Sequence, residues 1–96
     1  MRISSEAFSI GRVVISKRGR DRGNWFVVIL SDGEYVSIAD GNIRKIEKPK
    51  KKKIIHLQIT RYEMDLTQFD KIRLKNSDIR KFLNEIQNET GKDSLR

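Results

Sequence analysis

Basic side chains that can bind phosphate gather in two short segments of the sequence. The first is 17–24, in which arginines alternate with glycines and one aspartate. Arginine and lysine neutralise phosphates and release counterions from nucleic acid, and glycine lets the backbone approach an anion. We expect an RNA-binding loop whose glycines also serve a turn, and in which Asp21 pairs with an arginine and shapes the loop. The basic side chains are Lys17, Arg18, Arg20 and Arg22.

The second basic segment, 44–53, contains the only proline of the chain, Pro49. Because proline cannot donate to a strand ladder, it is expected at a sheet edge or in a loop. Lysine acts as a point charge, so this segment is predicted to add RNA affinity without reading sequence. The alternative is a solvated lysine run that protects a sheet edge from aggregation. The basic side chains here are Arg44, Lys45, Lys48, Lys50, Lys51, Lys52 and Lys53.

Trp25 follows the first basic segment directly and starts an apolar run. If Phe26, Val28 and Leu30 face the core, Trp25 lies on the other side of that strand. There it can stack on an RNA base, an interaction of about 1–3 kcal/mol in single-strand binders. The alternative is that it packs under a C-terminal helix or a partner protein. Tyr35 has the same two interpretations, and we expect core or rim packing for it.

The chain is poor in residues that support catalysis. It has no cysteine, which excludes disulfides and thiolate zinc sites, and one histidine, His56. We interpret His56 as a packed or rim residue that can touch RNA. No phosphate-binding loop, dinucleotide fingerprint or metal-ligand spacing is present. We therefore expect a non-enzymatic protein with no catalytic residues, no metal and no cofactor.

The charge balance favours a polyanionic partner. The 96 residues fit one domain and carry 21 Lys and Arg against 13 Asp and Glu, a net charge of +8. Residues 1–60 hold 13 basic and 6 acidic side chains, which is +7 of that total. Such a field attracts nucleic acid, although charge for solubility alone is the alternative. We find no signal-peptide pattern and no apolar run near the ~20 residues of a membrane span. The expected location is cytoplasmic, with no membrane partner.

Short runs rich in β-branched residues predict strands. The run at 25–30 is apolar throughout, which predicts burial on both faces. Asp32-Gly33 and Asp40-Gly41 predict hairpin turns, and we expect Asp40 to be a turn residue. The last predicted strand is expected to pair with the first and close a small barrel. The predicted strands span 11–16, 25–30, 34–39, 42–46 and 54–59.

A different period begins at Ser77 and predicts an amphipathic helix over 77–90. Ser77 is the expected N-cap, and Asp78 suits the first turn because of the helix dipole. The helix is expected to end before Gly91. Being marginal alone, it is predicted to cover an apolar side of the barrel, or otherwise to dock on a protein. Its apolar face consists of Ile79, Phe82, Leu83 and Ile86.

The segment 11–28 combines a strand, a basic glycine-containing loop and an apolar strand, and this combination resembles the KOW motif. That motif is a short element of SH3-like barrels in ribosomal proteins and transcription elongation factors. Four segments, one of them within 11–28, together resemble a family of small bacterial KOW-domain RNA-binding proteins, which is similar to a KOW-containing large-subunit ribosomal protein of archaea and eukaryotes. The resemblance covers about residues 10–59. The four segments are 19–23, 38–41, 44–53 and 56–58.

The resemblance implies a mainly β fold, a small SH3-like barrel of the KOW type, here with a C-terminal α-helix. It implies RNA binding in association with the ribosome and translation, with ribosomal RNA as the expected partner and ribosomal proteins or RNA polymerase as further candidates. The alternative is a protein-interaction module that uses Trp25 and the C-terminal helix. The predicted organisation is a barrel at 8–60, a connector at 61–76, a helix at 77–90 and a frayed tail at 91–96. The predicted RNA-binding residues are the basic side chains of segments 17–24 and 44–53, together with Arg12, Trp25 and His56.

Overall fold

The computed structural model describes residues 8–66 and 74–94, with side chains in the second segment described through Glu89. Within these residues, one antiparallel sheet has the strand order β4-β3-β2-β1-β5. The fold is therefore mainly β with one C-terminal helix, as predicted. The elements are β1 (Arg12–Ser16), β2 (Trp25–Asp32), β3 (Tyr35–Ala39), β4 (Lys50–Lys53), β5 (Leu57–Glu63) and α1 (Asn76–Ser94).

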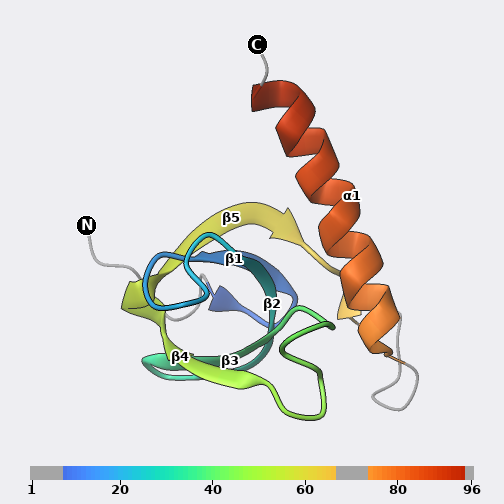
Figure 1. Ribbon diagram of the computed structural model, residues 1–96. Helices are drawn as coiled ribbons and strands as arrows, with labels where there is room; N and C mark the ends of the chain where they lie inside the picture. The colour runs from blue at the N-terminus through green and yellow to red at the C-terminus, as the bar shows by residue number, and fades with distance from the viewer. Residues whose placement is uncertain (1–7, 67–73, 95–96) are drawn as a thin grey trace.

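The sheet curls strongly but is not closed into a barrel, which corrects that part of the prediction (Figure 1). β4 and β5 lie at its two ends and do not pair with each other. The physical reason lies at Ile54–His56, which form one turn of 3-10 helix, η2, and so interrupt the strand predicted over 54–59. β5 begins only at Leu57 and then pairs with β1, as predicted for this segment, with Leu57 opposite Ser16.

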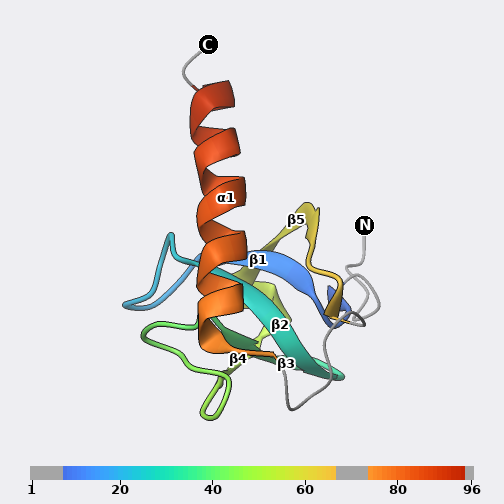
Figure 2. The same cartoon turned by 90° about the vertical axis from the view of Figure 1, so that its right-hand side faces the viewer.

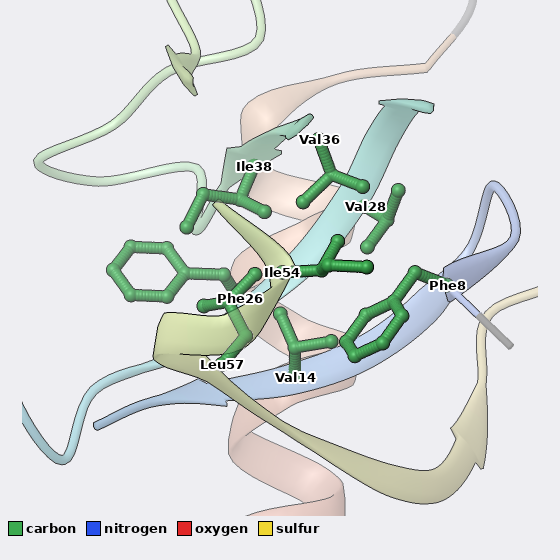
Figure 3. Packing of buried hydrophobic residues seen from close by; sticks show 8 residues of the cluster. All are labelled: Phe8, Val14, Phe26, Val28, Val36, Ile38, Ile54 and Leu57. Atoms are coloured by element: carbon green, nitrogen blue, oxygen red, sulfur yellow. The ribbon is translucent and has the colours of Figure 1, made fainter. Parts of the chain in front are cut away.

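Two apolar clusters lie on opposite faces of the sheet. The inner cluster fills the curl and brings Phe8 and Ile54 onto residues of β1, β2, β3 and β5 (Figure 3). The outer cluster joins β1, β2 and β3 to α1 through Val13, Val27 and Ala39 on the sheet side. The helix side of this cluster is Ile79, Leu83 and Ile86, all buried, so α1 covers an apolar face of the sheet as predicted.

β2 is buried on both faces over Phe26, Val27 and Val28, which confirms only the middle of the burial predicted for the apolar run 25–30. Phe26 and Val28 belong to the inner cluster, whereas Val27 belongs to the outer one. Leu30 was expected in the core but is 56% exposed. The cause is a register shift between Val28 and Leu30 in the pairing with β3, since an extra residue reverses the alternation of faces. The predicted hairpin at Gly33 is confirmed by the pairing of Asp32 with Tyr35.

The segment 42–46 is not the predicted strand; a loop, 40–49, connects β3 to β4. Several of its backbone N–H groups donate to acceptors within the loop or to a side chain of α1. The carbonyl of Arg44 accepts the N–H groups of Asp40 and Gly41, and the N–H of Ile46 donates to Asn76 Oδ1. The partner of β3 is instead the lysine run, with Ser37 opposite Lys51.

Helix α1 is longer than predicted at both ends. Its first turn is capped by Lys75 and not by Ser77. The carbonyl of Lys75 accepts the N–H of Asp78, and Asp78 Oδ2 accepts the N–H of Lys75, half of a capping box. The helix continues past Gly91 to Ser94. A glycine within a helix costs only about 1 kcal/mol, so it does not have to end the helix.

Parts of the predicted organisation lie outside the described residues, namely 67–73 of the connector and 95–96 of the tail. Within the described residues, no helix combines the length and the apolar character needed to cross a membrane.

Candidate nucleic-acid interface

The β1–β2 loop, residues 17–24, is a tight turn that presents its basic side chains outward. Gly19 and Gly23 have φ of 88° and 87°, the left-handed region that other residues rarely adopt, so the predicted turn role is confirmed. The N–H of Gly23 donates to the carbonyl of Ser16 over 2.8 Å. The side chains Lys17, Arg18, Arg20 and Arg22 are exposed.

A partly buried ionic network connects this loop to β4. Asp21 was expected to pair with an arginine, but its partners are lysines of β4. Lys52 Nζ lies 2.6 Å from Asp21 Oδ1, and Lys50 Nζ lies 3.0 Å from Asp21 Oδ2. The Ser16 hydroxyl donates to the same Oδ1 over 2.7 Å. The predicted role in shaping the loop is therefore supported, with two lysines on a distant strand in place of the arginine.

The network keeps Asp21 ionised. Burial by itself raises the pKa of this carboxyl, but hydrogen bonds from Lys52, Ser16 and Lys50 and the charge of Lys52 outweigh it. The pKa of Asp21 therefore lies far below its usual range. The Lys52 ammonium donates to Asp21, to Ser16 Oγ at 2.6 Å and to the carbonyl of Arg18 at 2.7 Å. These three acceptors match the three donors of an ammonium group.

The lysine run of β4 is thus divided by the alternation of a strand. Lys52 is buried and Lys50 is half-buried, both turned toward the β1–β2 loop. Lys51 and Lys53 are exposed, and their ammonium groups lie 5.0 and 5.8 Å from the centre of the Tyr35 ring. Tyr35 is half-buried at this rim. β4 is an edge strand, which agrees with the edge expected for this segment.

The β3–β4 loop, residues 40–49, is held in place by its own aspartate and by α1. Asp40 Oδ1 accepts the N–H groups of Asn42 and Arg44 over 2.9 and 2.8 Å, which confirms it as a turn residue. Arg80 of α1 donates to the carbonyl of Gly41 over 2.6 Å. Gly41 has φ of 76°, and a Cβ there would collide with a backbone carbonyl of α1. The helix therefore positions this loop.

The two loops project side by side from the same end of the sheet (Figure 2). A pocket of about 320 Å³ lies between them. Arg20 and Asn24 line it from the first loop, and Ile43 and Arg44 line it from the second. Lys50 and Asp21 line it too. The two predicted basic segments are therefore adjacent in space, and exposed Lys45 and Lys48 extend the second of them.

The other predicted residues do not line this pocket. Arg12 is directed toward β5, where its guanidinium lies 3.5 Å from Glu63 and 3.4 Å from the carbonyl of Thr60. Trp25 packs on the outer cluster with its ring centroid 6.3 Å from that of Tyr62, which favours the packing interpretation. His56 is half-buried in η2, and its carbonyl accepts the N–H of Lys17.

Sequence reasoning missed the neutral residues that complete this surface. Asn24, Asn42 and Ile43 lie in the two loops, and Asn84 and Gln87 lie on α1 beside them. Ile43 is 74% exposed. Of these residues, only Ile43 could have been found from the sequence, because it is an apolar side chain directly before the basic pair Arg44 and Lys45. We assigned it to a predicted strand instead.

Within the described residues, no group of three or more acidic or histidine side chains is placed to hold a metal ion. No model of a known protein family matches the chain, and no curated protein matches its sequence.

Proposed function

We propose that this protein binds structured RNA, in association with the ribosome, through the β1–β2 and β3–β4 loops. The observation that carries the proposal is the adjacency of the two loops around one pocket, with Arg20, Arg44 and Lys50 in its wall. Phosphate contacts supply most of the affinity in such interfaces and make it salt-dependent. Side chains cannot read the deep major groove of an A-form helix, so recognition there rests on shape and phosphates.

Lys50 and Lys52 have a structural part in this proposal. Their ion pairs with Asp21 tie the edge strand to the loop, so the loop offers its arginines with its one acid already neutralised. Lys17, Arg18 and Arg22 then remain exposed for phosphate. The strand order, the curl around one core and the basic first loop also support our assignment to the SH3-like, KOW-type class, although the sheet is open. The proposed role is binding without catalysis.

The alternative, a protein-interaction module built on Trp25 and the helix, receives less support. Ile79, Leu83 and Ile86 are buried against the sheet, so this face is already occupied. A partner protein could reach this face only if α1 moved off the sheet, whereas RNA contact by the loops needs no such movement.

The test is charge reversal of Arg18, Arg20 and Arg22 to Glu, with binding to labelled ribosomal RNA hairpins and co-sedimentation with ribosomal subunits measured across a salt series. We expect affinity to fall by at least about tenfold, because the variant loses phosphate contacts of three arginines. The slope of log affinity against log salt concentration should also become shallower by about 1 for each lost contact. The matched control is charge reversal of three other exposed residues, Arg61, Lys75 and Lys81, which changes the net charge equally and lies outside both loops. Equal losses in both triple variants would reject the loop as the contact.

A further inference from the structure

A second pocket adjoins the one between the loops. It has a volume of about 300 Å³ and lies between the two loops and α1. The two pockets share Asn24, Asp40 and Ile43 in their walls, so together they form one groove. We call the first the cationic pocket and the second the amide pocket.

The two pockets differ in chemistry. The cationic pocket presents Arg20 and Arg44, whose guanidinium groups suit phosphate oxygens. In the amide pocket the one cation, Arg80, is engaged with the carbonyl of Gly41. Asp40 also lines this pocket, and its Oδ1 accepts the N–H groups of Asn42 and Arg44. The other polar side chains of this pocket are amides, which offer both donors and acceptors. They are Asn24, Asn42, Asn84 and Gln87.

The amide pocket also has apolar surface. Trp25 and Leu83 contribute to its wall, and Ile43 stands 74% exposed where the two pockets meet. A nucleobase has a flat apolar face and an edge of donors and acceptors, and proteins bind such bases when they are unstacked. Amides beside apolar side chains match that combination, and an arginine-lined pocket next to them matches the phosphate of the same nucleotide.

We propose that the groove takes one unpaired nucleotide of the RNA, with its base in the amide pocket and its phosphate in the cationic pocket. This inference rests on the proposed function and adds the class of RNA to it. A fully paired duplex keeps its bases stacked and can use only the cationic pocket. An RNA with a bulge or a loop can use both pockets.

The test compares two labelled RNA duplexes, each made of two strands and free of loops, that differ only by one bulged adenosine, with affinities measured by fluorescence anisotropy on the full chain. We expect the bulged duplex to bind about tenfold more tightly, the size of one stacked base. In the variant Asn84→Ala/Gln87→Ala the preference should disappear while binding of the fully paired duplex is retained. Both side chains are exposed, so the fold is expected to persist. The matched control is Asn88→Ala. Asn88 is an exposed amide of α1, one turn after Asn84, and it does not line the pocket.

The outcomes separate the two proposals. Equal affinity of the wild-type protein for both duplexes, or an unchanged preference in Asn84→Ala/Gln87→Ala, would overturn the unpaired-nucleotide inference and leave the proposed function in place. Absence of binding to either duplex at low salt would overturn the proposed function and the inference with it.

Discussion

Lys52 is a buried cation whose three hydrogen bonds are all made to the β1–β2 loop and the residue that precedes it. Its ammonium group meets Asp21, Ser16 and the carbonyl of Arg18. A buried charge is tolerated only when it is paired and hydrogen-bonded. The contacts of Lys52 therefore decide how the loop sits on the sheet, while Lys51 beside it stays in solvent.

We predict that Lys52→Met destabilises the protein by about 3 kcal/mol, because the carboxylate of Asp21 loses its closest partner in a largely buried setting. Lys51→Met, the adjacent lysine of the same strand, should cost less than about 1 kcal/mol, since it loses only an exposed contact with the Tyr35 ring. Urea unfolding of both variants measures the difference. Equal costs would show that the Asp21–Lys52 pair adds no stability.

Asp21 also gives the stability a dependence on pH. Its pKa is lowered in the folded state, so the unfolded chain takes up the proton first as pH falls. The contribution of Asp21 is present in full above its ordinary pKa of about 4 and is lost progressively below it.

We therefore expect Asp21→Asn to be less stable than the wild-type protein at pH 7, with a gap that narrows from pH 5 to pH 2. The free energy of unfolding of both proteins across this range provides the check. A gap that is constant with pH would contradict an ionised Asp21 in the network.

At the scale of elements, α1 both covers the sheet and holds the β3–β4 loop. Leu83 is buried in the outer cluster, and Asn76 and Arg80 bind the loop. We predict that Leu83→Ala lowers stability by about 3 kcal/mol through the cavity it leaves. Lys81→Ala, an exposed neighbour, should change it by less than about 0.5 kcal/mol. Thermal melting distinguishes the two, and an unaffected melting temperature in Leu83→Ala would mean that α1 is only loosely attached.

Periodicity and turn chemistry predicted the elements that follow local rules. The apolar run of β2, the turn at Gly33 and the helix face at Ile79 and Leu83 were found this way, because each pattern matches its own backbone geometry. The ends of the helix were placed less well, since Ser77 is a good capping residue by type and the actual cap depends on Asp78 reaching back to Lys75.

Elements that depend on distant contacts were not predictable. Lys50 to Lys53 carry no alternation because all four residues are identical, so the sequence cannot show that Lys52 faces inward. The segment 42–46 has the local pattern of a strand. In the structure, however, the N–H of Ile46 donates to Asn76 Oδ1, thirty residues away, and this contact is not visible in the local pattern. Leu30 was assigned to the core because a register shift leaves no mark in an apolar run.

At the scale of the whole molecule, the fold brings together what the sequence separates. The basic segments 17–24 and 44–53 were both predicted to bind RNA, but their adjacency is produced by the Asp21 ion pairs and by the contacts of α1 with the second loop. The same arrangement places Asn84 and Gln87 beside the loops, and no local pattern in the helix marks those two amides as part of a site.

We propose that RNA binds at the end of the sheet where the two loops lie. Titration of the isotope-labelled protein with a ribosomal RNA hairpin, followed by backbone amide chemical shifts, shows which residues the RNA contacts. We expect the largest shifts in residues 18–24 and 41–48. Shifts confined to β5 and the β2–β3 turn, with both loops unperturbed at saturating RNA, would contradict it.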